Sequence, residues 1–271
     1  MYRNKLVLLC ILCFLGISGF SQERYFVSTL AGDTSNLAAN PFLNANAGWH
    51  DGLGSQALFN GPTGIAVDTI GNVYVADTYN NVIRKISASG TVTTIAGDTA
   101  DIKKGLDSNL GYIDGSAFNA KFSNPLGICV DKVGNVYVAD TYNNVIRKIS
   151  TTGTVSTYAG TNSFGYVNGA DSVAEFFAPT SLSIDAAGNI FVADEGNNAI
   201  RKIWAIGDSV TTLAGKGSDT AGYINGTLDT ALFITLFGVT TDKNGAIYAS
   251  QFGNGSNAIR RIYNGTVTTY A

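Results

Sequence analysis

Short apolar runs separated by glycine, asparagine and aspartate dominate the chain. One representative set of runs comprises residues 64–68, 73–76, 82–86 and 91–96. The runs are rich in β-branched and aromatic residues, and turn residues such as Gly71-Asn72 separate them. This pattern predicts short antiparallel strands joined by hairpins. No segment of comparable length shows convincing helical periodicity.

The second of these runs is apolar on both of its faces. Because side chains alternate along a strand, Val73 and Val75 point one way, and Tyr74 and Ala76 point the other way. A sheet with one face in water would alternate apolar with polar residues. Both faces must therefore be covered, and neighbouring four-stranded sheets packed face to face would cover them. A radial array of such four-stranded blades is a β-propeller, which is an all-β fold.

The pattern repeats along the chain. Residues 77–86, with the sequence DTYNNVIRKI, recur identically at 140–149, and weaker copies lie at 194–203 and 251–262. The copies start 63, 54 and 57 residues apart. Repetition with such a period is typical of an array of one supersecondary unit. We expect blades at about residues 48–97, 111–160, 165–215 and 222–271.

The repeat unit resembles the NHL repeat of secreted bacterial β-propellers. The resemblance is carried by Pro62–Ile86, with the sequence PTGIAVDTIGNVYVADTYNNVIRKI, and it extends over roughly residues 25–271. It implies a propeller that serves as an extracellular sensor, as a binder of protein or RNA, or occasionally as a lyase, so it leaves the activity open. The later copies depart from the pattern, with Ser181 in place of a glycine and Gln251 in place of an aspartate.

The two ends of the chain predict an incomplete ring. Residues 25–32 are similar to the fourth-strand runs that end at Gly97 and Gly215, so they predict one extra strand. The last blade already has its own fourth strand in residues 266–271, and the extra strand therefore lacks an acceptor. Since the resemblance implies about six blades, we expect a truncated piece of a roughly six-bladed ring. The alternative is a closed four-bladed ring with a redundant strand.

The first residues predict a signal peptide. Arg3 and Lys5 precede a short apolar run at 6–15, and small residues before Gln22 are suited to cleavage. The domains are then a signal peptide at 1–21 and a propeller at 22–271, with an uncleaved anchor as the alternative. We expect a secreted, periplasmic or cell-surface protein without a membrane span after cleavage.

Composition narrows the choice of partners. Hydrophobic residues make up 45% of the chain and charged residues 14%, which excludes a disordered chain. The net charge of −3 becomes more negative when the basic leader is removed, and this argues against a nucleic-acid partner. Cys129 would be the one cysteine left, so an intrachain disulfide is excluded.

Aspartates at the ends of the first strands are the candidates for a metal site. Each precedes a glycine by three residues, as expected for a side chain that accepts backbone N–H groups in a turn. A ring of carboxylates holding a divalent cation near the axis is the alternative, although nothing else in the sequence supports it, and we expect no cofactor. The four residues are Asp68, Asp131, Asp185 and Asp242.

A second set of charges recurs around the loop between strands two and three. Asp77 and Arg84 would be diagonal neighbours on one face, which predicts a structural ion pair in each blade. The last copy has Gln251 at the aspartate position, so Arg260 would lack that carboxylate and is a candidate anion-binding residue.

Aromatic residues open each repeat and are candidates for ligand binding. They could pack the loops onto the blades, or they could stack on a sugar or hold a peptide. These residues are Trp49, Tyr112, Tyr166 and Tyr223. His50 is the only histidine, so a histidine-rich zinc site is not expected.

These observations favour a non-catalytic binding or sensor scaffold that uses its inter-blade loops, with an unknown protein, peptide or glycan as its partner. The alternative is a metal-dependent hydrolase resembling the lactonase-type propellers. For that alternative, Glu195, Asn197 and Asn198 supply suitable residue types in one blade.

Overall fold

The computed structural model describes residues 28–33, 47–100, 102, 110–217, 220–253 and 257–271. The predicted signal peptide, 1–21, lies outside the described residues. Among the described residues, no helix has the length and the apolar character needed to cross a membrane.

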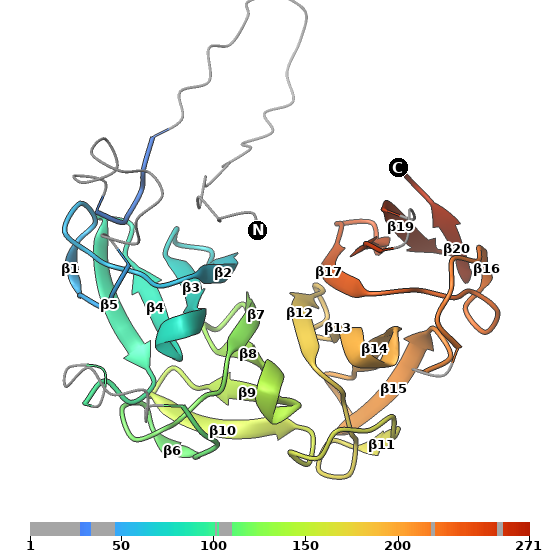
Figure 1. Cartoon of the computed structure of the whole chain (residues 1–271), viewed down its shortest axis with the longest axis horizontal. Coiled ribbons are helices and arrows are strands. Elements are labelled where there is room, and N and C mark those ends of the chain that lie inside the picture. The colour runs from blue at the N-terminus through green and yellow to red at the C-terminus, as the bar shows by residue number, and fades with distance from the viewer. Residues whose placement is uncertain (1–27, 34–46, 101, 103–109, 218–219, 254–256) are drawn as a thin grey trace, which may run out of the picture.

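The chain folds into four antiparallel sheets, each with the same strand order (Figure 1). Blade 1 consists of β2 (Pro62–Val67), β3 (Val73–Asp77), β4 (Val82–Ile86), β5 (Thr91–Ala96) and β1 (Gly52–Leu53). Blade 2 consists of β7 (Pro125–Val130), β8 (Val136–Asp140), β9 (Val145–Ile149), β10 (Thr154–Ala159) and β6 (Gly115–Ser116). Blade 3 consists of β12 (Pro179–Ile184), β13 (Ile190–Asp194), β14 (Ala199–Ile203), β15 (Ser209–Ala214) and β11 (Gly169–Ala170). Blade 4 consists of β17 (Leu236–Thr241), β18 (Ile247–Gln251), β19 (Ala258–Tyr263), β20 (Thr266–Thr269) and β16 (Gly226–Thr227).

The predicted all-β propeller with four meander blades is confirmed. In each blade the four predicted strands lie in sequence order, and a two-residue strand from the start of the repeat pairs with the outer edge. That fifth strand was not predicted, because two residues carry no periodicity. Three-residue 3-10 helices join the second and third strands in the first three blades: η1 (Thr78–Asn80), η4 (Thr141–Asn143) and η5 (Glu195–Asn197).

The blades pack face to face around a common axis (Figure 1). The first strands β2, β7, β12 and β17 form the inner row, and each contacts the next. All five residues of β3 are buried, as are those of β8 and β13. Tyr74 and Ala76 of blade 1, for example, belong to one apolar cluster with Phe122 and Ile128 of blade 2. The prediction that neighbouring blades cover the faces of the sheets is therefore confirmed at the junctions between blades.

The four blades form an arc that is open between blade 4 and blade 1 (Figure 1). Side chains on the two end faces are correspondingly more exposed than their equivalents at the junctions. Ile65 of blade 1 is 37% exposed, whereas Ile128 of blade 2 is 4% exposed. Ile259 of blade 4 is 36% exposed, whereas Ile83 of blade 1 is fully buried.

The N-terminal segment 28–33 lies against blade 1 but is not part of a strand. The extra strand predicted over 25–32 is thus not formed in residues 28–32, and residues 25–27 lie outside the described residues. Gly32 nevertheless donates its N–H to the Gly54 carbonyl at 2.8 Å, just as Gly97 donates to Ala117 at 2.8 Å. The segment therefore occupies the position that the end of a fourth strand takes at the junction between blades 1 and 2.

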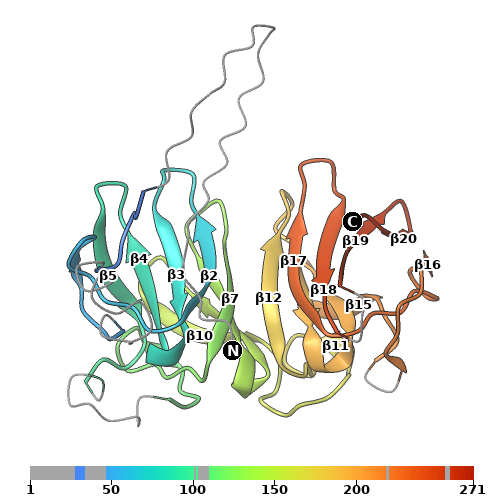
Figure 2. The same cartoon turned by 45° about the horizontal axis from the view of Figure 1, so that its top comes forward.

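The molecule has two loop-bearing faces (Figure 2). We call the side with the turns between first and second strands the hairpin face; it carries residues 68–72, 131–135, 185–189 and 242–246. We call the other side the helix face; it carries η1, η4, η5 and the equivalent residues 252–253 of blade 4.

Asparagines on the helix face fix each blade to the next. Asn81 follows η1 with φ of 51°, in the left-handed region that asparagine tolerates well. Its side-chain oxygen accepts the backbone N–H of Asn124 in blade 2 at 2.8 Å. Asn144 and Asn198 make the same contact at the next two junctions. Together with the apolar clusters, these bonds join each blade to the next.

Candidate functional site

A buried arginine lies at the centre of each blade. Arg84 donates from Nη1 to Asp77 Oδ2 and to the Leu58 carbonyl, both at 2.8 Å. Its Nη2 donates to the His50 carbonyl at 2.7 Å and to Asp51 Oδ1 at 2.8 Å. The guanidinium thereby joins the third strand to the start of its own repeat. We call each such arginine with its acceptors an arginine hub.

The predicted ion pair between the second and third strands is confirmed in three blades. Arg84–Asp77, Arg147–Asp140 and Arg201–Asp194 each have an N–O distance of 2.8 Å, and all six side chains are fully buried. Burial raises the pKa of Asp77 to about 6, against the opposing effect of hydrogen bonds from Asn60, Asn80 and Arg84. The carboxylate is therefore still ionised at neutral pH and pairs with the arginine.

The four hubs differ in how many carboxylates they contain. The outer acceptor is Asp51 in blade 1 and Asp114 in blade 2, but it is Asn168 in blade 3 and Asn225 in blade 4. The inner acceptor is an aspartate in the first three blades and Gln251 in blade 4. The hub charge consequently changes from negative in blades 1 and 2, through neutral in blade 3, to positive in blade 4.

The aromatic residues that open the repeats cover these arginines. The rings of Tyr112, Tyr166 and Tyr223 lie 4.9–5.1 Å from the guanidinium carbons of their hubs. The Tyr112 hydroxyl also shares a hydrogen bond of 2.7 Å with Thr157. Trp49 is half-buried and donates from Nε1 to Thr94 Oγ1 at 2.9 Å. This geometry makes all four residues anchors of the outer loops, with the tyrosines 37–41% exposed.

The first-strand aspartates are engaged in their own turns. Asp68 Oδ1 accepts the backbone N–H groups of Ile70 and Asn72, and Oδ2 accepts from the Asn72 amide and the Tyr74 hydroxyl. Burial acts to raise the pKa of Asp68, but these hydrogen bonds outweigh it and lower the pKa. Asp131, Asp185 and Asp242 form equivalent turns. Within the described residues, no group of three or more histidine, cysteine, aspartate or glutamate side chains could hold a metal ion.

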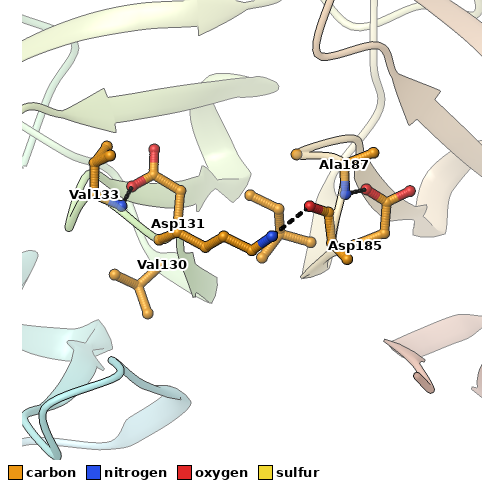
Figure 3. A pocket seen from close by; sticks show the side chains of 9 residues that line it. Val130, Asp131, Val133, Asp185 and Ala187 are labelled. Atoms are coloured by element: carbon orange, nitrogen blue, oxygen red, sulfur yellow. Dashed lines mark hydrogen bonds between the residues drawn. The ribbon is translucent and has the colours of Figure 1, made fainter.

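A pocket of about 380 Å³ lies on the hairpin face between blades 2 and 3. Lys132 reaches across it and donates to the Ala186 carbonyl at 2.7 Å. Asp131 and Asp185 border it, but Figure 3 shows each carboxylate bound to a backbone N–H of its own turn. The pocket therefore offers a mainly apolar wall and one ammonium group.

The residues proposed for a hydrolase site have structural partners. Asn197 donates to the Gly165 carbonyl at 2.7 Å and to Asp194 Oδ2 at 2.8 Å. Asn198 forms the junction to blade 4 described above. Glu195 is partly buried, and burial raises the pKa of its carboxyl group. Cys129 is buried in an inner strand, and burial raises the pKa of its thiol, which disfavours the thiolate needed for nucleophilic chemistry.

Exposed aromatic rings on the helix face were not among the predicted site residues. Tyr79 and Tyr142, at equivalent positions in η1 and η4, are 68% and 70% exposed. Blade 3 has Gly196 at this position, and the ring of Phe177 covers it. In blade 4, Phe252 is 51% exposed and contacts Phe237. The tyrosines lie within the repeat, but their sequence alone does not show that they face solvent.

The architecture defines a β-propeller, and comparison with known proteins gives the family. The family model of the NHL repeat matches residues 59–86, and that of the teneurin NHL domain matches residues 104–172. The repeats of this chain are therefore of the NHL type, as the sequence predicted.

Curated relatives match part of this chain. Mouse Teneurin-4 is 30% identical over 199 residues, which are 67% of this chain and 7% of that protein. Human NHL repeat-containing protein 2 is 32% identical over 157 residues, which are 54% of this chain and 21% of that protein. The chain therefore spans about a fifth or less of the length of these relatives.

Solved structures share the fold. A structural genomics protein of unknown function from Bacteroides thetaiotaomicron has a TM-score of 0.59 and 21% identity, with 77% of this chain and 47% of that chain covered. An auxiliary nutrient binding protein from Bacteroides ovatus has a TM-score of 0.56 and 20% identity, with 79% of this chain and 50% of that chain covered.

Proposed function

We propose that the chain is an exported, non-catalytic binding scaffold whose helix face engages a protein, peptide or glycan. The observation that carries this proposal is the presence of an exposed aromatic ring on the helix face of every blade. NHL propellers as a class support a binding or scaffold role, and the basic and apolar leader at 1–21 favours export.

The rings are held on a rigid support, which favours binding. A side chain in place of Gly61 would come within 2.4 Å of the Tyr79 ring, so the ring lies directly on the backbone that leads into β2. Aromatic side chains give a large contact area with little loss of conformational entropy, and such rings are frequent hot spots of recognition.

The repeats differ in sequence at these positions but keep a ring. Blades 1 and 2 use a tyrosine from the 3-10 helix, blade 3 uses Phe177 from the segment before the first strand, and blade 4 uses Phe252. A purely internal role does not require that repeats with different sequences each keep an exposed ring. The variation therefore supports contact with a ligand that spans several blades.

The first experiment probes the helix face directly. The purified chain is screened on glycan and peptide arrays, and binding of the strongest hit is then measured for a Tyr79→Ala/Tyr142→Ala double variant. We expect the double variant to lose at least about tenfold in affinity, because two exposed anchors are removed. Val133→Ala is the matched control, because Val133 is 72% exposed on the hairpin face.

Two results would contradict the proposal. One is undiminished binding by the double variant with reduced binding by the Val133 control. The other is metal-dependent turnover in a lactone and ester screen together with stoichiometric calcium or zinc, which would favour the hydrolase. Export is tested separately by intact-mass analysis of the secreted chain, for which we expect a mature protein that begins at Gln22.

A further inference from the structure

The hub of blade 4 contains a buried arginine without a counter-charge. Arg260 is fully buried. Its Nη1 donates to Gln251 Oε1 and to the Leu232 carbonyl, both at 3.0 Å, and its Nη2 donates at 2.8 Å to Asn225 Oδ1 and to the Ile224 carbonyl. All four acceptors are neutral. Within the described residues, no carboxylate lies within ion-pair distance of this guanidinium. Its Nε has no hydrogen-bond partner, as is also the case for Arg147 and Arg201.

Blade 1 shows what the same position accepts when a carboxylate is present. Asp51 Oδ1 lies 3.2 Å from Arg84 Nε and 2.8 Å from Nη2, and it accepts the Thr94 hydroxyl at 3.0 Å. In blade 2, Asp114 pairs with Arg147 and also accepts the backbone N–H of Thr157 at 3.0 Å. The outer part of a hub is therefore a carboxylate-binding site formed by an arginine and a threonine.

The same donors are present in blade 4. Thr269 lies opposite Arg260 in the sheet, as Thr94 lies opposite Arg84. The rings of Tyr223 and Phe233 lie 4.9 and 5.1 Å from the guanidinium carbon of Arg260. The outer carboxylate of the hubs in blades 1 and 2 is replaced by the amide of Asn225, and this residue is exposed to solvent. Rotation of the Asn225 side chain would open the position without moving the arginine.

We propose that the hub of blade 4 binds a carboxylate from solution, which displaces the Asn225 amide and pairs with Arg260 Nε and Nη2 and with Thr269. Charge-assisted bonds between guanidinium and carboxylate are stronger than bonds to a neutral amide. A buried guanidinium without a counter-ion is unfavourable, and the incoming anion removes that penalty. Burial also lowers the pKa of Arg260, because it disfavours the charged form of the guanidinium. The inference is independent of the proposed function of the helix face.

The test compares wild type with Asn225→Asp, using acetate as the probe. Thermal unfolding is followed in sodium acetate and in sodium chloride at equal ionic strength and pH. For wild type we expect a saturable rise of the unfolding midpoint in acetate, of about 3 °C at tenfold the dissociation constant. Asn225→Asp supplies its own carboxylate, so its midpoint should be higher in chloride and should not respond to acetate.

Asn168→Asp in blade 3 is the matched control. It makes the same change in a hub that already contains Asp194, and it leaves Arg260 unaltered. This variant should keep the full acetate response. Saturation-transfer NMR with acetate measures binding without relying on stability, and glucuronate in the same assay distinguishes a free small anion from a carboxylate carried on a sugar.

The proposal is overturned if acetate and chloride give the same midpoint for wild type. It is equally overturned if Asn225→Asp keeps the acetate response and the NMR signal, because the anion then binds elsewhere. An acetate response that is lost in Asn225→Asp and kept in Asn168→Asp supports the site.

Discussion

At the scale of single residues, the arginine hubs combine charge and hydrogen bonding within a small buried volume. In blade 2, Arg147 donates hydrogen bonds to the Asp140 carboxylate and to two backbone carbonyls, those of Lys121 and Ile113. Asp140 also accepts hydrogen bonds from Ser123 and Asn143, which are neutral, and Arg147 supplies the charge that pairs with its carboxylate. The hub thus links four separate parts of the repeat.

Arg147→Met should be among the most destabilising single changes in the chain. It leaves the carboxylate of Asp140 buried without a counter-charge, for which the expected loss is about 3–5 kcal/mol of unfolding free energy. The midpoint of urea unfolding measures the effect. Lys243→Met is the control, since Lys243 is exposed, and it should change stability by less than about 0.5 kcal/mol. Similar midpoints for the two variants would refute a structural role of the hub.

Asp171 provides a pH-dependent test at the same scale. Burial and the neighbouring charge of Asp208 raise its pKa from 3.8 to about 6. Because the pKa is higher in the folded chain, this group contributes stability below its unfolded pKa, and the contribution is lost as the pH rises through about 6.

Asp171→Asn should therefore be more stable than wild type at about pH 8, and the difference should vanish at about pH 4. Thermal unfolding at the two pH values measures it. Because the side chain is partly exposed, we expect a gain of about 1 kcal/mol or less. A variant that loses stability at the higher pH would show that the carboxylate is stabilising instead.

At the scale of elements, close approach of the inner strands limits which residues they can contain. A Cβ atom at Gly64 in β2 would lie 2.1 Å from the Leu126 carbonyl oxygen in β7. In β12, Ser181 takes the equivalent place, and its hydroxyl accepts the Val239 N–H of β17 at 3.1 Å. The departure from the repeat at Ser181 is thus used as a contact between blades.

Gly64→Ala should push β2 away from β7. We expect a loss of about 1–3 kcal/mol, the usual range for overpacking, measured by chemical unfolding. Gly48→Ala is the control, because a Cβ atom there meets only the flexible side chain of Leu58, at 3.3 Å. Equal stability of Gly64→Ala and the control would mean that the inner strands are packed less tightly than described.

The boundaries of the strands could be predicted well from the sequence, and the surface proposed for binding could not. The run 82–86 was expected as a strand and is β4, because β-branched residues flanked by turn residues leave few alternatives. The pairing of Asp77 with Arg84 also followed from strand register. Exposure of Tyr79 depends on which side of the 3-10 helix faces solvent, and that is set by packing against Gly61 in another part of the repeat.

At the scale of the whole molecule, the position of a blade in the arc determines what an equivalent residue contributes. Ile83 and Ile259 occupy the same place in blades 1 and 4, but only Ile83 has a neighbouring blade against it. Ile83→Ala should reduce stability by about 2–5 kcal/mol. Ile259→Ala should reduce it by about 1 kcal/mol or less.

Chemical unfolding of this matched pair tests the open arc in solution. If the two alanine variants lose the same stability, the outer face of blade 4 is covered as completely as a junction. Ile128→Ala and Ile65→Ala form an equivalent pair for the other end, where exposure is 4% and 37%. The order of effects in both pairs should follow the exposed fractions.

The asparagine contacts between blades have a consequence for how such a chain can change over time. Asn81, Asn144 and Asn198 set each junction from within the repeat, although the connecting segments differ in length, running from 98 to 110 at the first junction and from 161 to 164 at the second. A duplicated gene segment encoding one repeat would therefore already contain both halves of the contact it needs. The identical decapeptides at 77–86 and 140–149 are what a recent duplication of this kind would leave in a genome.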